Sequence, residues 1–381
     1  MDNERIGVYV HWPFCARLCP YCDFNIYKDK TDLAVDLTES ILRDLETWRE
    51  ASGERSLISL HFGGGTPSLM PVSHLQEIID KVLALWTPRS DIEIALEANP
   101  NDISKELLEG WRSVGIERLS IGVQSFDDEV LKFLGRNHDG ATSRKALELA
   151  IDHMPRVSAD LIYGWVGQTS EHWKAELAQA ISFKTGHISA YQLTIEEKTA
   201  FAQAERRGEA RAVDSDTSAD LFEIVGEMLR AEGYARYEVS NFAKSQNDQS
   251  RHNRLYWQGD DYVGVGPGAH GRLTVDDQRF ATVSALKPAA YITDGASFNA
   301  ARSSRDHMSR EDWAAEYLLM GMRVSEGISL QRFEKLSGKE LDKEIVMPLV
   351  EQGLLTRTDD RLWASEQGRL VLDTICHQLL S

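Results

Sequence analysis

Short apolar runs rich in β-branched residues alternate with amphipathic patterns through the first two thirds of the chain. The runs that predict strands are Gly7–Trp12, Leu57–Phe62, Ile92–Glu97, Arg118–Gln124, Val157–Ile162 and Ile188–Thr194. Apolar residues recur at helical spacing in the stretches between and after them, which are Asp32–Trp48, Val72–Trp86, Ser104–Val114, Ser143–His153, Glu171–Phe183 and Asp216–Arg230. Repeated strand–helix units imply parallel strands joined by right-handed crossovers. The pattern therefore predicts an α/β fold, either a partial (βα)6 barrel or an open doubly wound sheet.

The alternation ends after one more predicted strand, Tyr237–Phe242. A polar stretch, an aromatic cluster and a glycine-dense segment follow, and residues 296–305 have the composition of a linker. Three helical patterns then precede a predicted hairpin over residues 353–364, an order that resembles a winged helix. The predicted parts are a barrel over 1–242, a connecting segment over 243–305 and a helical, winged-helix-like C-terminal domain over 306–381.

Charge and hydropathy restrict the partners and the compartment. The chain has 42 Lys and Arg against 60 Asp and Glu, a net charge of −18, which opposes binding to nucleic acid. We therefore expect the winged-helix-like domain to pack against the barrel and not to bind DNA. The first residues lack the basic and apolar regions of a secretory signal, and no apolar run approaches the ~18 residues that cross a bilayer. These features predict a cytoplasmic protein whose contact with membranes is at most peripheral.

Three of the four cysteines, Cys15, Cys19 and Cys22, lie on one loop after the first predicted strand, with the spacing C-x3-C-x2-C. Three thiolates can ligate three irons of a [4Fe–4S] cluster and leave the fourth iron open for the amino and carboxylate groups of S-adenosylmethionine. Zinc is the rival interpretation, but structural zinc sites take four ligands, usually as two separated pairs. The fourth cysteine, Cys376, is predicted to be buried in the core.

The chain resembles the radical S-adenosylmethionine superfamily, and within it the oxygen-independent coproporphyrinogen III dehydrogenase group. The stretches that carry the resemblance are Tyr9–Cys15 (YVHWPFC), Gly63–Ser68 (GGGTPS), Gly122–Phe126 (GVQSF) and Asp160–Gly164 (DLIYG). The resemblance implies a partial barrel of the radical S-adenosylmethionine type that holds both cofactors.

Each of these motifs falls at the carboxyl end of a predicted strand, the face on which α/β barrels build their sites. Glu97, Gln124 and Asp160 are polar residues within apolar runs, so burial requires that each be paired with a neighbour or a ligand. The resemblance places these three around the cofactor, near its ribose hydroxyls. It also implies contacts with S-adenosylmethionine for seven further residues, which are Tyr9, Tyr21, Gly64, Gly65, Thr66, Arg136 and Thr194. Among these, Arg136 would bind the methionine carboxylate and Thr194 the adenine.

Two departures bear on the function. The dehydrogenases carry a further cysteine two positions after the third cluster ligand, where this chain has Phe24, and an N-terminal extension for which Cys15 leaves no room. The segment Arg251–Trp257 (RHNRLYW) instead resembles the H-N-x-x-Y-W pattern of HemW-type heme chaperones. An imidazole can ligate heme iron, so we expect His252, or failing that Tyr256, to bind heme as cargo. A satisfied histidine in an aromatic mini-core is the alternative.

The resulting hypothesis is a heme chaperone that delivers heme to hemoproteins of the respiratory chain. Oxidative decarboxylation of coproporphyrinogen III is the rival activity, and whether the chain forms a homodimer is left open. Three other histidines, His138, His153 and His187, are predicted to be structural or exposed.

Overall fold

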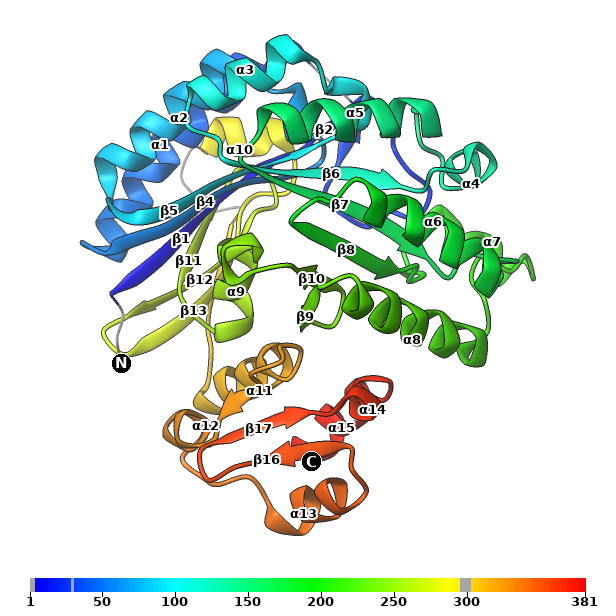
Figure 1. The fold of residues 1–381 in the computed structure, drawn as a ribbon. Helices are drawn as coiled ribbons and strands as arrows, with labels where there is room; N and C mark the ends of the chain where they lie inside the picture. The colour runs from blue at the N-terminus through cyan, green and yellow to red at the C-terminus, as the bar shows by residue number, and fades with distance from the viewer. Residues whose placement is uncertain (1–3, 29–30, 295–302) are drawn as a thin grey trace.

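The structure is a computed structural model that describes residues 4–28, 31–294 and 303–381. Its main body is a twelve-stranded sheet in the order β14-β13-β12-β11-β1-β4-β5-β6-β7-β8-β10-β9 (Figure 1). Seven adjacent strands run parallel, namely β11 (Tyr262–Val265), β1 (Arg5–Trp12), β4 (Ser56–Gly64), β5 (Thr87–Ala98), β6 (Arg118–Gln124), β7 (Arg156–Tyr163) and β8 (His187–Gln192). All six predicted barrel strands are confirmed, in chain order, and the sheet is consistent with a partial barrel.

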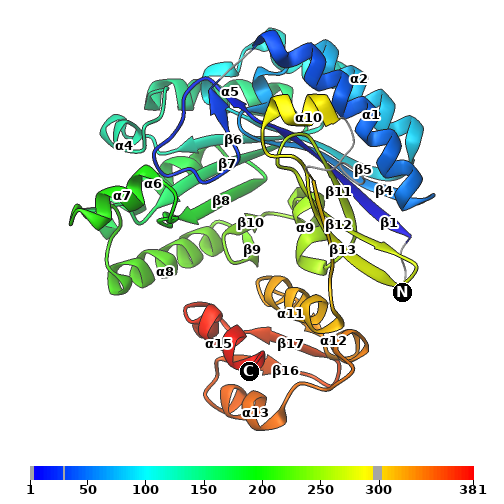
Figure 2. The ribbon, with the colours of Figure 1, turned by 180° about the vertical axis from the view of Figure 1, so that it is seen from behind.

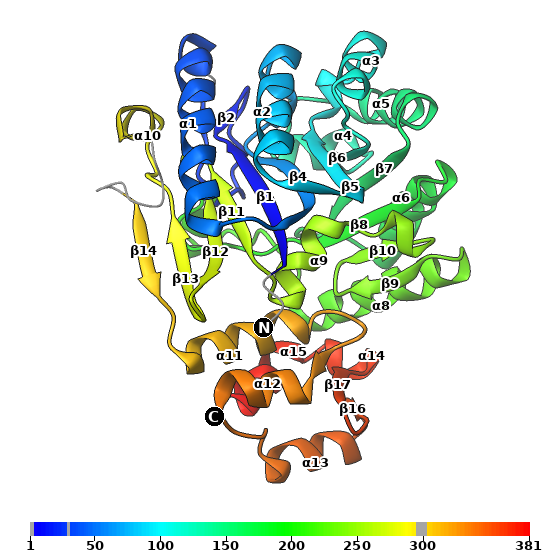
Figure 3. The same ribbon diagram turned by 90° about the vertical axis from the view of Figure 1, so that its left-hand side faces the viewer.

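Helices cover the outer face of the curved sheet (Figure 3). They are α1 (Ala34–Ser52), α2 (Val72–Leu85), α3 (Lys105–Ser113), α5 (Gly140–His153), α6 (Ser170–Ser182) and α8 (Ser215–Ala231), with the short α4 (Asp128–Phe133) and α7 (Ala200–Arg206) near the strand ends. Outward-facing side chains such as Leu60, Leu96 and Leu119 form the hydrophobic core with the helices. Burying each such leucine stabilises the fold by about 1.5–3 kcal/mol. The inward-facing positions alternate with them and are largely polar, which leaves the inside of the sheet available for a site.

The prediction of one strand over Tyr237–Phe242 is wrong, because this segment folds back on itself. The structure has a hairpin of β9 (Ala235–Glu238) and β10 (Asn241–Ala243). The Glu238 carboxylate closes the turn, since its Oε2 accepts from Ser240 N at 2.9 Å and from Asn241 Nδ2 at 2.7 Å.

The segment after this hairpin continues the main sheet. It contains α9 (Arg251–Gln258), β11, β12 (His270–Val275), β13 (Gln278–Val283), α10 (Pro288–Asp294) and β14 (Ser304–His307). β11 adds a seventh parallel strand beside β1, which the sequence pattern did not predict. Of the predicted linker 296–305, residues 296–302 lie outside the described residues.

The C-terminal domain has its own core, to which Cys376 belongs as predicted. Its elements are α11 (Arg310–Gly321), β15 (Ile328–Ser329), α12 (Leu330–Ser337), α13 (Lys343–Glu351), β16 (Leu355–Arg357), β17 (Arg361–Ala364), α14 (Glu366–Arg369) and α15 (Leu372–Leu379). The domain lies at the end of the main body where β1 begins, a placement that Figures 2 and 3 show from two sides. Arg323 pairs with Glu238 there at 2.7 Å, so the domain packs against the main body as predicted. No helix in the described part of the chain is long and apolar enough to cross a membrane.

Candidate cofactor site

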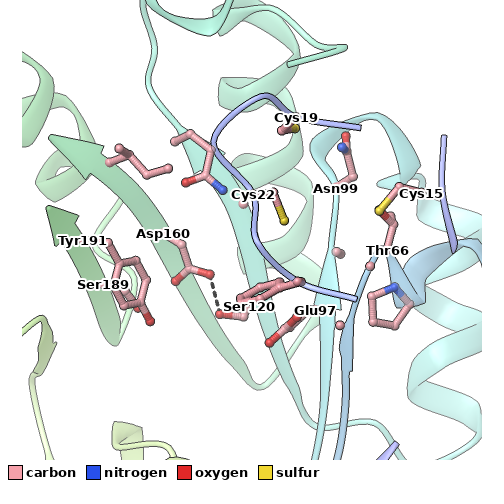
Figure 4. A pocket seen from close by; sticks show the side chains of 18 of the residues that line it. Cys15, Cys19, Cys22, Thr66, Glu97, Asn99, Ser120, Asp160, Ser189 and Tyr191 are labelled. Atoms are coloured by element: carbon pink, nitrogen blue, oxygen red, sulfur yellow. Dashed lines mark hydrogen bonds between the residues drawn. The ribbon is translucent and has the colours of Figure 1, made fainter. Parts of the chain in front are cut away.

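A cavity of about 430 Å³ lies inside the curved sheet and opens beside the cysteine loop (Figure 4). Residues from the carboxyl ends of β4, β5, β6, β7 and β8 line it, together with Cys15, Cys19 and Cys22. Loops and strand ends that are far apart in the sequence meet here because the strands are parallel.

The cysteine loop is held by backbone hydrogen bonds. Cys15 ends β2 (Phe14–Cys15), which pairs with β3 (Tyr27–Lys28), so the loop is closed at its base. The glycine loop after β4 joins this base, since Gly65 N donates to Trp12 O at 2.7 Å and Thr66 N donates to Phe14 O at 2.8 Å. A Cβ atom on Gly65 would lie 2.7 Å from Phe14 O and 3.0 Å from Cys15 Sγ. Glycine is therefore required for the two loops to approach each other.

The donor set fits a [4Fe–4S] cluster. The three thiols come from one loop and face one cavity, and a cluster takes one thiolate on each of three irons. Within the described residues, no group of three His, Cys, Asp or Glu side chains is placed to hold a single metal ion. Arg136 Nη1 lies 3.7 Å from Cys19 Sγ, so a guanidinium group stands directly beside the cysteine loop.

The structure brings the predicted S-adenosylmethionine residues together, with one exception. Of the predicted residues, those that line the cavity are Tyr21, Gly64, Gly65, Thr66, Glu97, Gln124, Arg136, Asp160 and Thr194. Tyr9 is the exception and does not line the cavity. Its hydroxyl is 3.1 Å from His11 Nδ1, and its ring stacks against the His61 ring with 6.1 Å between the ring centroids. Their roles as ligands stay predictions.

Charged and polar groups line the cavity, among them Arg136, Asp160 and Glu97. Arg136 Nη2 donates to Gly122 O at 3.0 Å, whereas Arg136 Nε is buried and, among the described residues, has no hydrogen-bond partner. That unused donor suits a carboxylate. Asp160 accepts from Ser120 Oγ at 2.7 Å and Ser158 Oγ at 2.8 Å, and burial raises the pKa of its carboxyl group above the ordinary value. Glu97 Oε1 lies 3.0 Å from His61 Nε2.

Several further residues line the cavity that the sequence did not predict, which are His61, Asn99, Ser120, Ser189, Tyr191 and Asn253. A signal for three of them was present. Ser120, Ser189 and Tyr191 stand at alternate positions of strands whose other positions are apolar, so they face the inside of the sheet. Pairing this alternation with the strand order would have identified them.

Helix α9 carries the H-N-x-x-Y-W segment and fills the end of the barrel opposite the cysteine loop (Figures 1 and 3). His252 is 1% exposed, and both of its ring nitrogens are engaged: Nδ1 lies 2.8 Å from Ser59 Oγ and Nε2 lies 2.5 Å from Tyr256 Oη. Of this motif, only Asn253 lines the cavity. Heme ligation by His252 or Tyr256 stays a prediction.

Both ends of α9 are capped by charges from other elements. At its start, the Glu93 carboxylate accepts from Arg251 N at 3.1 Å and from His252 N at 3.0 Å. At its end, Arg332 of the C-terminal domain donates to Gln258 O at 2.8 Å and to Gly259 O at 3.1 Å. Anions at the start and cations at the end of a helix both stabilise it.

His138, one of the histidines predicted to be structural or exposed, is buried with Nε2 3.1 Å from Val123 O. Burial, and then the nearby Arg136 charge, lower the pKa of His138 to about 4. The unfolded chain takes up this proton near pH 6.5, so the free energy of unfolding falls as the pH drops from about 6.5 toward 4.

We expect His138→Gln, which keeps a donor for Val123 O, to reduce this loss. Between pH 7.5 and 5.5 the free energy of unfolding should fall by about 1 kcal/mol less in the variant than in the wild type. Urea denaturation at the two pH values measures the difference. Equal losses in the two proteins would contradict the assignment.

Two family models match the chain. A family model described as the radical SAM superfamily matches residues 9–180, and one described as the HemN C-terminal domain matches residues 308–371. The heme chaperone HemW of Bacillus subtilis is 32% identical, with 96% of this chain and 96% of that protein covered. HemW of Escherichia coli is 33% identical, with 99% and 98% covered.

A bovine relative, radical S-adenosyl methionine domain-containing protein 1, mitochondrial, is 34% identical, with 100% of this chain and 88% of that protein covered. Among solved structures, coproporphyrinogen III oxidase (HemN) from Escherichia coli has a TM-score of 0.81 at 21% identity, covering 100% of this chain and 91% of the other. That likeness shows the fold. The identities over nearly whole lengths show that the chain belongs to the HemW family of radical S-adenosylmethionine proteins.

Proposed function

We propose that this protein is a heme chaperone that binds heme through α9 and passes it to other hemoproteins. The observation that carries the proposal is the similarity, over nearly the whole chain, to proteins named heme chaperone HemW, combined with an H-N-x-x-Y-W segment that forms one intact helix. Acceptors in the respiratory chain, a cytoplasmic location and peripheral contact with a membrane belong to the same proposal.

In this proposal the cavity holds the cofactors. Cys15, Cys19 and Cys22 would ligate a [4Fe–4S] cluster, and Arg136 would bind the methionine carboxylate of S-adenosylmethionine, with Glu97 and Asp160 at its hydroxyl groups. When bound, such a cluster can supply one electron to S-adenosylmethionine. The chain's own residues orient the ligand and screen it from water.

The side chain at position 24 favours a carrier over the rival enzyme. Phe24, which stands where the dehydrogenases carry a further cysteine, is 61% exposed at the mouth of the cavity, so no thiol is available there. Oxidative decarboxylation of coproporphyrinogen III is the second candidate function. It is supported by the fold that this chain shares with the oxidase HemN.

Heme ligation by His252 requires a change in α9. Because the ring is buried and both nitrogens are hydrogen-bonded, the first turn of α9 must move away from Ser59 before the imidazole can meet iron. The structure described here would then be the heme-free position of the helix.

Two measurements on anaerobically reconstituted protein test the proposal. We expect a heme titration to give a stoichiometric shift of the Soret band that His252→Ala weakens at least about tenfold, since a metal ligand is lost. His153→Ala, which changes a histidine on the outer helix α5, should leave the shift unchanged. Protoporphyrinogen IX formed from coproporphyrinogen III and S-adenosylmethionine at catalytic rates, or no Soret shift, would reject the carrier.

A further inference from the structure

Two chains of contacts run from the carboxylates of the cavity to helix α9. The first is short. Glu97 Oε1 lies 3.0 Å from His61 Nε2. The His61 ring stacks on the His252 ring, with 4.8 Å between the ring centroids and 12° between the ring planes. Within the described residues Glu97 is the sole hydrogen-bond partner of the His61 side chain, and the rings of His252 and Tyr9 stack on it. The orientation of His61 therefore depends on Glu97 and on these two rings.

The second chain is a continuous run of hydrogen bonds. Ser158 Oγ donates to Asp160 Oδ1 at 2.8 Å and lies 2.7 Å from His187 Nδ1. His187 Nε2 lies 2.7 Å from Tyr237 Oη, and this hydroxyl accepts from Ser250 N at 3.2 Å. The donors are consistent along the run when Nδ1 of His187 carries the proton. Ser250 is the N-cap of α9, so the run ends at the first turn of that helix.

α9 also forms part of the cavity wall. Ser250 and Asn253 line the cavity together with Glu97 and Asp160. The cavity that would hold S-adenosylmethionine is therefore complete only while α9 stays in place. Withdrawal of α9 would remove two lining residues from the cavity. It would also leave His61, which positions Glu97, with the Tyr9 ring and without the closer His252 ring.

We propose that S-adenosylmethionine and heme bind this protein antagonistically, with His61 and Tyr237 as the positioning residues that link the cavity to α9. The inference rests on the proposed function, in which heme needs α9 displaced from the barrel. S-adenosylmethionine favours the observed position of α9 and heme favours the displaced one. A ligand shifts a two-state equilibrium by its differential affinity for the states, so each ligand weakens the other by the same factor.

The first experiment measures this factor in both directions with the full-length, cluster-loaded protein. Heme is titrated by its Soret band with and without saturating S-adenosylmethionine, and S-adenosylmethionine is measured by equilibrium dialysis with and without heme. We expect each ligand to raise the Kd of the other by about 5- to 150-fold, equally in both directions. An unchanged heme Kd, with S-adenosylmethionine shown to be bound, would overturn the antagonism, and so would a lower one.

Two variants that keep an aromatic ring test the two contact chains. His61→Phe keeps a ring to stack on His252 but loses the hydrogen bond to Glu97, and Tyr237→Phe loses the hydroxyl that joins His187 to Ser250. We expect each variant to reduce the coupling factor and the double variant to bring it near 1. His153→Phe on the outer helix α5 is the matched control and should keep the wild-type factor. A double variant with the wild-type factor would reject both residues as links.

Hydrogen exchange separates the failure of this inference from the failure of the proposed function. S-adenosylmethionine alone is expected to slow exchange of the α9 amides, residues 251–258, and unchanged exchange would overturn the link between cavity and helix. If no heme binds under any condition, the carrier function is rejected. Slower exchange in α9 would then still support the link to the cavity.

Discussion

The Glu93→Gln variant is expected to lose about 3–5 kcal/mol of its free energy of unfolding. Glu93 is fully buried, and its carboxylate pairs with Arg156 Nη1 at 2.8 Å besides capping α9. Burial by itself would raise the pKa of Glu93, yet the Arg118 and Arg156 charges and the α9 amides lower it below the ordinary value. Neutralising this carboxyl group leaves buried cations with less compensation. Urea denaturation at pH 7.5 measures the loss.

Glu117 provides a matched control because it binds the same guanidinium. Its Oε1 lies 2.8 Å from Arg156 Nη1, but its side chain is 32% exposed, so water compensates for its loss. Glu117→Gln should cost less than about 1 kcal/mol. Equal losses in the two variants would show that the burial of Glu93 is not what makes its charge important.

Gly65→Val is expected to abolish most of the cluster content. The added Cβ would lie 2.7 Å from Phe14 O and 2.9 Å from Trp12 O, both backbone atoms that cannot rotate away. The cysteine loop must therefore shift at its base, and a cluster needs its three thiolates in fixed positions. We expect bound iron after anaerobic reconstitution to fall at least about fivefold, close to the level of Cys19→Ser, in which a ligand is removed outright.

Gly110→Ala is the control for this substitution. Gly110 lies in α3 on the outer layer, and its added Cβ would lie 3.2 Å from a Val72 methyl, so a side chain and no backbone atom has to shift by a few tenths of an ångström. Alanine also favours a helix over glycine by up to about 1 kcal/mol. Iron content should match that of the wild type. A Gly65→Val protein with full iron content would show that the glycine loop does not determine where the cysteines lie.

The sequence predicted the parts of the fold that depend on local pattern. Strand–helix alternation identified the six barrel strands because each is an apolar run bounded by turns. β11 escaped prediction because it has only four residues, Tyr-Val-Gly-Val, one of which is a glycine, and because its partner β1 lies more than 250 residues away. The hairpin of β9 and β10 was read as one strand because its turn is closed by the Glu238 side chain and not by glycine or proline.

The same distinction holds for the candidate site: the parts that depend on local motifs were predicted, and those that depend on long-range packing were not. Cysteine spacing and the motifs at strand ends identified the mouth and walls of the cavity. Asn253 and the contacts of His252 could not be predicted, because they depend on α9 entering the barrel from the opposite end. Gly7 marks that entry: its missing Cβ would lie 2.5 Å from Leu255 Cδ1, yet a glycine in a strand gives no hint of which helix needs the space.

The hydrogen bonds from Arg332 to the last turn of α9 have a mechanical consequence. Arg332 belongs to α12, its guanidinium stacks on Tyr317 at 4.7 Å, and its two donors end on the carbonyls of Gln258 and Gly259. A force that rotates the C-terminal domain is therefore transmitted to the backbone of α9. A protein that binds the C-terminal domain and rotates it would break the two hydrogen bonds from Arg332 to α9 without contacting the barrel.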